Sequence, residues 1–373
     1  MAWAEIDLAA IAHNTQEVKR WIGAKTELAA VVKANAYGHG LVPVSRAVLR
    51  AGADRLAVVS VSEAMTLRRG GIQGRILLMG FSLAEDAPAI VHYGLTPTVN
   101  SQALAAALSD AALAQGRVAP VHLKVDTGMG RFGLLTEEVV PFAKELVRRP
   151  GLRLEGFWTH FATAEEADKS FTRQQLAVYQ QVLADLHGAG IHVPVRHAAN
   201  SGATLDLPET HLDLVRCGIL LYGLYPSPEL NRPVDLRPVL TLKARVGRVR
   251  TLPGGASVSY GRTYVTPGPT PVALVPIGYG DGYHRCLSNR GMVLVQGQRA
   301  SILGRVCMDQ FVVDVSGISA VHEGDEVVII GAQGDDRISA EEVAVWGQTA
   351  NYEVITSLTS RVPRVYLGAD QAG

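Results

Sequence analysis

Residues 30–40 read Ala30-Val31-Val32-Lys33-Ala34-Asn35-Ala36-Tyr37-Gly38-His39-Gly40. An apolar, β-branched run leads into a single lysine and a glycine-rich turn, which predicts a buried strand that ends at Lys33. An ammonium group at such a position is poorly solvated, so the pKa of Lys33 should fall. A partly neutral amine is a nucleophile that can form a Schiff base with an aldehyde. Taken alone, Lys33 is better explained as a lysine whose stem is buried and whose head reaches water.

Short apolar runs alternate with helical patterns through the first 235 residues, which is the signature of repeated βα units. The strand-like runs are Leu28–Val32, Arg55–Val59, Ile76–Met79, Pro97–Val99, Val121–Val125, Leu154–Thr159, Val195–Ala198 and Leu214–Val215. Helical patterns lie between them, for example at Ser101–Ala114 and Thr172–His187. About eight such units predict an α/β fold, a (β/α)8 barrel of the TIM type. An open doubly wound sheet is the alternative, but no GxGxxG motif opens a helix after the first strand.

The spacing of apolar residues changes between Pro233 and Pro238. From Leu240 to Val246 apolar and polar residues alternate, which predicts a half-exposed strand. Further strand-like runs follow at Val272–Val275, Met292–Val295, Phe311–Val315 and Glu326–Ile330. One helix is expected after Ser339, where Ser339 and Glu342 can form a capping box. We therefore predict a barrel over residues 1–235 and a mainly β domain over residues 236–373.

Composition excludes several classes of function. The chain has 373 residues, of which 47% are hydrophobic, and its 35 basic and 35 acidic residues give no net charge. This balance predicts neither nucleic acid nor an anionic membrane as a partner. No apolar stretch approaches the ~20 residues that span a bilayer, and the acidic N-terminus is unlike a signal peptide. The three cysteines have no CxxC spacing, so we expect no disulfide framework, no metal site and a cytoplasmic location.

Most polar motifs of the first domain fall at the ends of predicted strands. In a (β/α)8 barrel these ends converge on one face, where active sites are built. We therefore expect Lys33, Arg131, His160, Ser201 and Arg216 to approach one another although they are far apart in the sequence.

Eight further segments carry a resemblance to a known family. In chain order they are Lys124-Val125-Asp126-Thr127-Gly128-Met129-Gly130-Arg131, Trp158-Thr159-His160-Phe161, His197-Ala198-Ala199-Asn200-Ser201, Arg216-Cys217-Gly218-Ile219, Ser259-Tyr260-Gly261, Pro276-Ile277-Gly278-Tyr279-Gly280-Asp281-Gly282, Gly304-Arg305-Val306-Cys307-Met308-Asp309 and Tyr352-Glu353. With residues 30–40 they resemble, in the same order, the motifs of the alanine racemase family. The resemblance implies a fold type III enzyme that uses pyridoxal 5'-phosphate (PLP) to interconvert L-alanine and D-alanine, the latter for peptidoglycan. It also implies a cytoplasmic homodimer whose active sites each draw on both subunits.

Binding of PLP needs hydrogen-bond donors for a dianionic phosphate. Backbone N–H groups of Gly218 and Ile219 can donate, and the hydroxyls of Ser201, Tyr37 and Tyr352 can add to them. The ordinary alternatives are a βα turn at Gly218 and a helix cap at Ser201.

The resemblance assigns the pyridine nitrogen of PLP to Arg216. An arginine stays protonated at any working pH, so it donates to an unprotonated ring nitrogen and disfavours side reactions such as transamination. His197 would orient Arg216 and His160 would contact the cofactor ring, although each is equally explained as a satisfied core histidine. The alternative for Arg216 itself is a surface salt bridge, which the preceding Leu214-Val215 run disfavours.

Racemisation needs a base on each face of a planar carbanion. Lys33, released when substrate replaces it in the Schiff base, can serve one face. By resemblance Tyr260 of the second subunit serves the other. The unperturbed pKa of tyrosine is ~10, so neighbouring positive charge would have to lower it. Taken alone, Tyr260 is better explained as a half-buried aromatic residue in a β turn.

The remaining site residues also follow from the resemblance. Arg131 would contact the phenolic oxygen of PLP and the substrate carboxylate. Lys124 would be carbamylated by CO2 and would fix Arg131, which requires a neutral, shielded amine; an interaction of Lys124 with Asp126 or solvent is the simpler interpretation. Tyr279 and the Met308 backbone would line the substrate pocket across a dimer interface, unless Met308 is core packing.

Three other functions remain as alternatives. A serine or broad-specificity racemase is the nearest, because an apolar pocket rejects a hydroxyl only weakly. A fold type III PLP decarboxylase would have no use for a base of the Tyr260 kind. A non-catalytic PLP carrier resembles the barrel alone, so residues 236–373 argue against it.

Overall fold

The computed structural model describes residues 2–368, which divide into two compact units. The first, called here the barrel unit, comprises Ala10–Ala36 and Leu41–Arg237. The second, called here the β unit, comprises residues 2–9, 37–40 and 238–368 of the described chain. None of the helices in the described part of the chain is both long and apolar enough to cross a membrane.

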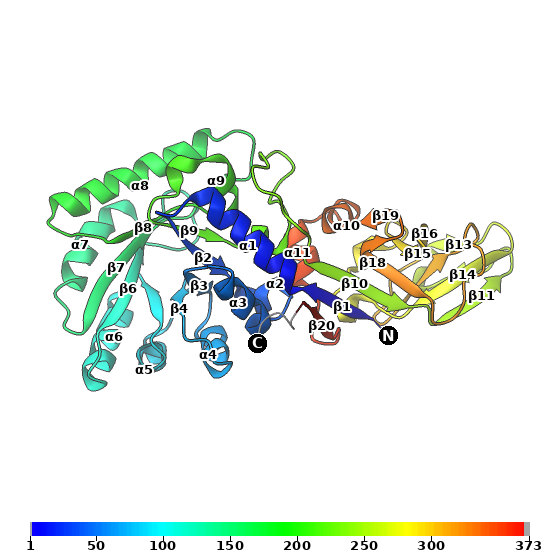
Figure 1. Cartoon of the computed structure of the whole chain (residues 1–373), viewed down its shortest axis with the longest axis horizontal. Coiled ribbons are helices and arrows are strands. Elements are labelled where there is room, and N and C mark those ends of the chain that lie inside the picture. The colour runs from blue at the N-terminus through cyan, green and yellow to red at the C-terminus, as the bar shows by residue number, and fades with distance from the viewer. Residues whose placement is uncertain (1, 369–373) are drawn as a thin grey trace. The chain divides into compact units, whose positions relative to one another are not determined.

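The barrel unit is built on an eight-stranded parallel sheet (Figure 1). Its strands are β2 (Glu27–Val31), β3 (Arg55–Val58), β4 (Arg75–Leu78), β5 (Thr96–Val99), β6 (Ala119–Lys124), β7 (Leu152–Trp158), β8 (Val195–His197) and β9 (Leu214–Cys217). Neighbours in space are neighbours in sequence from β2 to β8, and β9 pairs with β2. The strands read as continuous apolar runs because both of their faces are buried, as expected of parallel strands covered by helices. The predicted (β/α)8 barrel is confirmed.

Strands β8 and β9 meet by fewer backbone bonds than the other neighbours. Asp213 N donates to Arg196 O (3.1 Å), and Arg216 N donates to Ala199 O (3.1 Å). The Asp213 carboxylate also accepts from Arg196 Nε (2.7 Å) and from Arg196 N (2.8 Å). An ion pair and scattered backbone bonds therefore connect the last two strands and nearly close the barrel.

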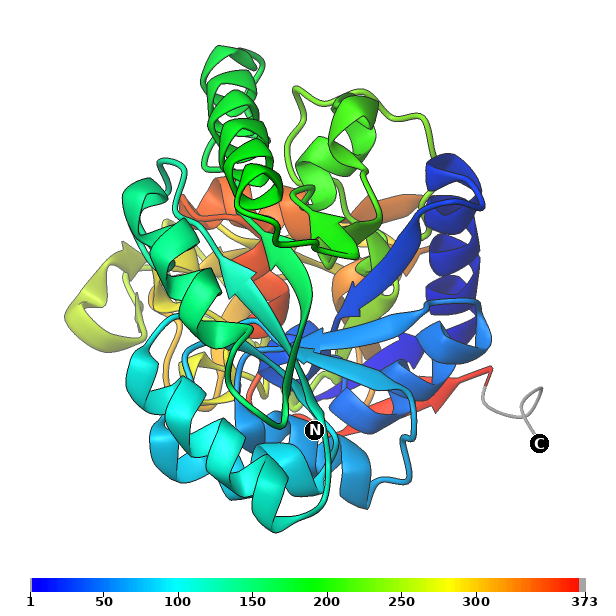
Figure 2. The same cartoon turned by 90° about the vertical axis from the view of Figure 1, so that its left-hand side faces the viewer.

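Helices lie outside the strands of the barrel unit, as the end-on view in Figure 2 shows. They are α1 (Leu8–Ile22), α3 (Leu41–Arg50), α4 (Val61–Arg69), α5 (Ala87–His92), α6 (Gln102–Ala114), α7 (Thr136–Leu146), α8 (Ser170–Gly188) and α9 (Ser201–Asp206), with short 3₁₀ turns η1 (Ala84–Asp86), η2 (Pro208–Thr210) and η3 (Ile219–Tyr222). Side-chain caps fix several starts. Ser60 and Glu63 form a capping box at α4, and Ser101 caps α6 where the sequence predicted its first residue.

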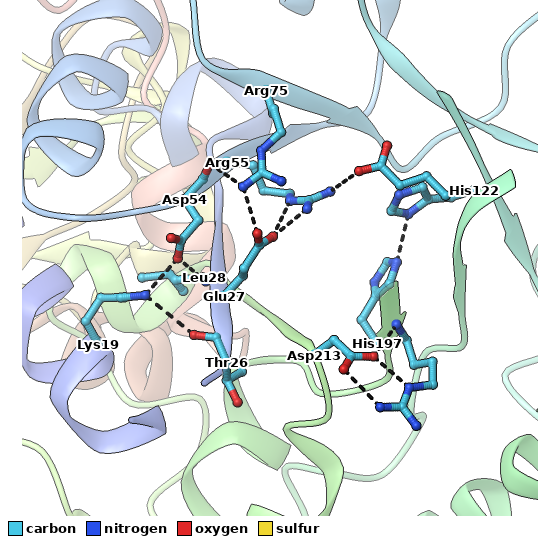
Figure 3. Close-up of polar contacts among 12 residues, drawn as sticks. Lys19, Thr26, Glu27, Leu28, Asp54, Arg55, Arg75, His122, His197 and Asp213 are labelled. Carbon is cyan, nitrogen blue, oxygen red and sulfur yellow. Dashed lines mark hydrogen bonds and ion pairs between the residues drawn. The ribbon is translucent and has the colours of Figure 1, made fainter. Parts of the chain in front are cut away.

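A network of charges lies at the amino-terminal ends of the barrel strands (Figure 3). The side chain of Arg55 is only 1% exposed and pairs with Glu27, through Nε at 3.0 Å and through Nη2, while its Nη1 lies 3.6 Å from Glu155. Arg75 pairs with the other oxygen of Glu27 at 2.8 Å. A buried guanidinium is tolerated here because carboxylates on β2 and β7 neutralise it.

The β unit contains a ten-stranded, mostly antiparallel sheet. Its strands are β1 (Trp3–Asp7), β10 (Leu240–Arg245), β11 (Arg248–Leu252), β14 (Thr270–Val275), β15 (Met292–Val295), β16 (Gln298–Leu303), β17 (Phe311–Asp314), β18 (Glu326–Gln333), β19 (Asp336–Ile338) and β20 (Arg364–Leu367). The pair β12 (Ser257–Val258) and β13 (Tyr264–Val265) stands apart, and the 3₁₀ turns are η4 (Tyr260–Arg262), η5 (Tyr279–Asp281) and η6 (Arg285–Leu287). Strand β10 alternates buried and less buried residues, which confirms the period-two prediction.

Two helices complete the β unit, α10 (Ala340–Gly347) and α11 (Asn351–Thr356). Ser339 caps α10 by accepting from Glu342 N (3.1 Å), which is one half of the predicted capping box. The Glu342 carboxylate pairs with Arg299 on β16, so this side chain ties the helix to the sheet.

The β unit also takes in two segments that precede residue 236. Strand β1 is antiparallel to β10 and parallel to β20, so its backbone bonds place residues 3–7 in this sheet. Residues 37–40 are held by Arg364, whose Nε donates to Gly38 O (3.0 Å), and by the close approach of Gly40 to the Tyr366 ring. The two units are therefore not two successive stretches of the chain, because residues 3–7 and residues 37–40 both bond to residues beyond 350.

Candidate active site

The carboxyl ends of the barrel strands bring four cationic side chains together. Lys33 follows β2, Lys124 ends β6, Arg216 lies near the end of β9, and Arg131 follows β6 after a tight loop. All four charges lower the pKa of His160, which follows β7, and burial of its ring lowers it most. Of the five residues for which barrel geometry predicted convergence, Lys33, Arg131, Arg216 and His160 lie within electrostatic reach of one another. The fifth, Ser201, bonds to Gly218 after β9.

Lys33 begins an unusual turn, α2 (Lys33–Tyr37), in which Ala34, Asn35, Ala36 and Tyr37 all have φ between 52° and 54°. We expected a glycine-rich turn directly after the lysine; four residues with side chains instead adopt the left-handed conformation, which is costly for them. The Glu63 carboxylate accepts from Ala34 N (2.6 Å). Such strain is typical of functional sites, where the surrounding structure enforces it.

The amine of Lys33 is half-buried and electrostatically activated. Burial lowers the pKa of Lys33 most, the charge of Arg131 lowers it further, and Glu63 opposes both effects. The predicted fall of the Lys33 pKa thus has two causes, desolvation and a neighbouring cation.

Arg216 is buried and bonded only to neutral acceptors. Its Nη1 donates to His197 Nδ1 (3.0 Å), and its Nη2 donates to Thr159 O (2.9 Å), Ala198 O (3.0 Å) and His160 Nδ1 (3.2 Å). No carboxylate within residues 2–368 lies at ion-pair distance from it, so it is no surface salt bridge. Burial lowers the pKa of Arg216 to about 10, which leaves it charged at neutral pH.

The Trp158 ring lies against three polar side chains of this interior. The Arg216 guanidinium lies 4.7 Å from the ring centroid, and Lys124 Nζ lies 5.2 Å from it. The His197 ring stacks on Trp158 at 5.6 Å with an interplanar angle of 9°. Sequence reasoning quoted Trp158 within a motif but gave it no role, because only the strand register shows that it faces inward.

Lys124 is enclosed rather than solvated. Its Nζ donates to Phe132 O and lies 5.4 Å from the Phe132 ring centroid. Burial lowers the pKa of Lys124 to about 8, with Asp126 opposing and the charges of Arg216 and Arg131 adding to the fall. Nearly buried and partly neutral near pH 8, this amine meets the condition stated for carbamylation.

The Asp126 carboxylate holds the loop that carries Arg131. It accepts from the backbone N–H groups of Gly128 (2.9 Å), Met129 (2.8 Å), Gly130 (3.1 Å) and Arg131 (3.0 Å). Burial alone would raise the pKa of Asp126, but these bonds and Lys124 lower it. The predicted Lys124–Asp126 contact is thus electrostatic, while the carboxylate oxygens bond to the loop backbone.

Ser201 begins α9 after β8, and Gly218 directly follows β9. Ser201 Oγ accepts from Gly218 N at 3.0 Å, and Ile219 starts the 3₁₀ turn η3. Asn200, rather than Ser201, caps α9 by accepting from Ala203 N (3.0 Å). The ordinary interpretation of Ser201 as a helix cap is therefore wrong, and its hydroxyl faces the donor that we predicted for a phosphate.

Tyr37 and Tyr352 lie together in the β unit. Their ring centroids are 6.3 Å apart, and Tyr37 is buried while Tyr352 is half-buried. A Cβ at Gly38 would lie 2.4 Å from Ile355 O, so only glycine allows the segment after Tyr37 to approach α11.

Tyr260, Tyr279 and Met308 lie on connected loops of the β unit. Ser259 Oγ donates to Arg305 O (2.6 Å), Tyr279 N donates to Cys307 O (3.0 Å), and Gly280 N donates to Met308 O (2.9 Å). The three side chains are nevertheless open to solvent in this chain, at 72%, 41% and 51% exposure for Tyr260, Tyr279 and Met308. Met308 is therefore not core packing, and Tyr260 is not half-buried.

The predicted residues thus fall into groups. The barrel unit brings together Lys33, Lys124, Arg131, His160 and Arg216, with Ser201, Gly218 and Ile219 around the end of β9. The β unit holds Tyr37 with Tyr352, and Tyr260 with Tyr279 and Met308. Sequence reasoning missed Trp158 and Glu63 as contributors, and it did not foresee that Asp126 organises the Arg131 loop.

Comparisons with known proteins find one family over nearly the whole chain. Residues 6–226 match the family described as alanine racemase, N-terminal domain, and residues 239–366 match alanine racemase, C-terminal domain. An alanine racemase of Desulforamulus reducens is 50% identical over 98% of this chain and 99% of its own length. The alanine racemase structure from Streptomyces lavendulae is 43% identical, covers 98% of this chain and 97% of its own, and has a TM-score of 0.94.

The same fold also occurs in a relative with another name. A histidine racemase from Leuconostoc mesenteroides subsp. sake is 31% identical, covers 98% of this chain and 98% of its own, and has a TM-score of 0.90. Since both family domains and relatives of up to 50% identity match nearly the whole chain, the protein belongs to the alanine racemase family.

Proposed function

We propose that this chain is a PLP-dependent racemase that interconverts L-alanine and D-alanine. The observation that carries the proposal is the convergence of Lys33, Lys124, Arg131 and Arg216 around His160 at one end of the barrel. Such a concentration of cations, with two amines whose pKa values are lowered, suits a ligand that is both anionic and carbonyl-bearing. The names of the relatives support alanine as the substrate.

The residues of the barrel unit fit PLP. Arg216 is a buried side chain that can only donate, as a pyridine nitrogen with a free lone pair requires. The Ser201 hydroxyl accepts from Gly218 N–H and keeps its own proton to donate to a phosphate. The N–H groups of Gly218 and of Ile219, at the start of η3, would be the backbone donors beside it. PLP would supply an aldehyde for the substrate amine and a ring that delocalises the electrons left by the α-proton.

Lys33 has the properties of the first base. Its pKa is lowered by burial and by Arg131, so more of the amine is neutral at a given pH and can accept a proton. Arg131, held by the Asp126 loop, would bind the substrate carboxylate and keep the α-carbon before Lys33. The neutral His160 would line the cofactor ring without adding charge.

Tyr260 is the second base in this proposal, and it would come from a second copy of the chain. Its exposure, together with that of Tyr279 and Met308 on connected loops, supports a surface that another subunit covers. A homodimer would then place Tyr260 on the opposite face of the α-carbon from Lys33. Tyr279 and the Met308 backbone would line the substrate pocket, and Tyr37 and Tyr352 would add phosphate contacts.

Lys124 would carry a carbamate. The neutral amine attacks CO2, a C–N bond forms, and the amine proton leaves to solvent. The resulting anion would offset part of the positive charge of Arg131 and Arg216, which both lower the pKa of Lys124. A bridging anion between β6 and the Arg131 loop would hold the arginine in place.

The substrate is tested by a chiral assay of the protein with PLP in D2O. L-alanine, L-serine, L-histidine, L-lysine and L-ornithine are offered separately. D-alanine that carries α-deuterium, formed at a higher kcat/KM than the other products, is expected. Preferred turnover of serine or histidine would change the substrate, CO2 release would indicate a decarboxylase, and no turnover with PLP bound would indicate a carrier.

In this proposal the protein works in the cytoplasm and supplies D-alanine for peptidoglycan. The absence of net charge agrees with a small-molecule enzyme that binds neither nucleic acid nor anionic membranes.

A further inference from the structure

A line of hydrogen bonds runs from Arg216 into the barrel. Arg216 Nη1 donates to His197 Nδ1 at 3.0 Å, and His197 Nε2 lies 2.9 Å from His122 Nδ1. Figure 3 shows the two imidazoles facing each other between β6 and β8, with the Arg55 network near His122. Both rings are fully buried and Arg216 is nearly so.

The direction of this line follows from chemistry alone. A guanidinium has only donors, so His197 Nδ1 must be unprotonated. The proton of a neutral His197 then sits on Nε2, which donates to His122. His122 Nδ1 must therefore accept, and its own proton sits on Nε2. A proton on His122 Nδ1 would set two donors against each other at 2.9 Å.

Both imidazoles are held neutral by their surroundings. Burial lowers the pKa of His122 and of His197 well below the usual value, and the charges of Arg55 and Arg216 lower both further. A second proton on His197 would face Arg216 donor to donor. The order of donors and acceptors is thus fixed from Arg216 to His122.

His122 makes one hydrogen bond and leaves another group unpaired. Its Nε2 is buried and has no hydrogen-bond partner among residues 2–368. The ring packs on Gly156, where a Cβ would lie 2.5 Å from His122 Nδ1, so a larger residue on β7 would displace it. A buried unpaired N–H costs stability, and an apolar residue here would avoid that cost. What an apolar residue lacks is the acceptor for His197.

We infer that His122 is a positioning residue for the racemase reaction, acting through His197 to fix the direction in which Arg216 presents its N–H groups to the cofactor. The inference rests on the proposed function, in which Arg216 faces the PLP ring nitrogen. Arg216 requires the His197 tautomer whose Nδ1 accepts, and His122 stabilises that tautomer by accepting its Nε2 proton. Without His122, a His197 proton on Nε2 is unpaired, and one on Nδ1 repels Arg216.

The proton positions are tested by neutron diffraction from crystals of the full chain with PLP. We expect deuterium on Nε2 and none on Nδ1 in both His122 and His197. Deuterium on Nδ1 of either ring would overturn the inference. This measurement needs no activity, so it stands whether or not the protein racemises alanine.

Two matched variants test the consequence for the cofactor site. His122→Phe keeps a flat ring without an acceptor, and His122→Asn replaces the acceptor at Nδ1 by an amide oxygen. We expect His122→Phe to weaken PLP binding and to lower kcat about tenfold or more, the usual effect of an unpaired buried donor, with KM for alanine nearly unchanged. We expect His122→Asn to restore most of both. His187→Phe, at an exposed position on α8, is the control.

The outcomes separate the inference from the proposed function. An equal loss of PLP affinity and kcat in the Phe and Asn variants would mean that His122 acts only through packing. No loss in either variant would mean that His122 does not act on the site. If His122→Phe does not fold, neutron diffraction of the unaltered chain still decides. If the unaltered chain binds PLP but racemises nothing, the proposed function fails, and the contrast between the variants in PLP affinity still tests the inference.

Discussion

At the scale of single residues, the site contains two lysine amines in surroundings that disfavour their protonated form. Lys33 and Lys124 both have lowered pKa values, and in both burial is the largest cause. Their environments differ, since Lys33 faces Arg131 and Glu63 while Lys124 lies against the Trp158 and Phe132 rings. Lys33 is thereby suited to reaction with an aldehyde and to proton transfer, and Lys124 is suited to reaction with CO2.

Replacement of Lys33 by alanine should remove the covalent link to PLP. The absorbance band of lysine-bound PLP should disappear, and racemisation should fall at least about a thousandfold because a nucleophile and a base are lost together. Lys25→Ala, at an exposed position before β2, is the control and should keep both. A retained band in Lys33→Ala would remove Lys33 from its role.

Lys124 should form a carbamate that depends on pH in a defined direction. Its pKa is about 8, so the neutral fraction is about one tenth at pH 7 and about one half at pH 8. At constant dissolved CO2, the rate of carbamate formation should therefore rise about fivefold over this interval. A ¹³C NMR resonance from ¹³C-labelled CO2 that is lost in Lys124→Met measures it. An identical resonance in Lys124→Met would assign the carbamate elsewhere.

At the scale of elements, short loops place the functional side chains. The loop that carries Arg131 is held by a side chain. The Asp126 carboxylate accepts from the consecutive backbone N–H groups of residues 128–131. Glu63 plays a similar part, because it caps α4 and also accepts from Ala34 at the start of the left-handed turn. Two carboxylates thus hold, through backbone N–H groups, the segments that carry Arg131 and Lys33.

Asp126→Asn should loosen the Arg131 loop. An amide offers one acceptor oxygen in place of two and points N–H groups at a backbone donor, so we expect a cost of about 1–3 kcal/mol. The pKa of Asp126 is lowered on folding, so its stabilisation is complete above the ordinary carboxyl pKa and lost as the pH falls through the folded value. Urea unfolding and faster hydrogen exchange at residues 128–131 measure the effect at neutral pH, with the exposed Asp110→Asn as control. Unchanged exchange would contradict it.

The barrel strands could be predicted because burial on both faces leaves a strong local signal. Runs such as Val121–Val125 coincide with β6 to within two residues at each end. Strand β1 lacks a continuous apolar run, because its five residues include Glu5 and Asp7. Its partners β10 and β20 lie more than 230 residues away. Its place depends on long-range pairing that no local pattern encodes.

The site residues divide in the same way. Arg216 and His160 were predictable, because motif residues at strand ends meet in a barrel. The turn at residues 34–37 was not, because Ala34 and Ala36 have no preference for positive φ and only tertiary contacts enforce it. Trp158 and His122 were missed because their roles depend on which residues of neighbouring strands face the interior. Residue identity shows chemistry, whereas register decides which groups meet.

At the scale of the whole molecule, the two bases of the proposed mechanism belong to separate units. Lys33 belongs to the barrel unit, and the exposed Tyr260 belongs to the β unit. In a two-fold symmetric dimer each subunit can give its Tyr260 to the Lys33 of the other. The proposed two-base mechanism then makes each site dependent on both chains.

Mixing two inactive variants tests this directly. Lys33→Ala and Tyr260→Phe chains are dissociated, mixed in equal amounts and reassociated. If the bases come from different subunits, half of the dimers carry one chain of each kind. In such a dimer one site has both natural bases and the other has neither, so activity should return to about one quarter of that of the unaltered protein. Each variant reassociated with itself is the control. If both bases come from one chain, every site lacks a base and mixing restores nothing, so the absence of recovery would exclude the shared site.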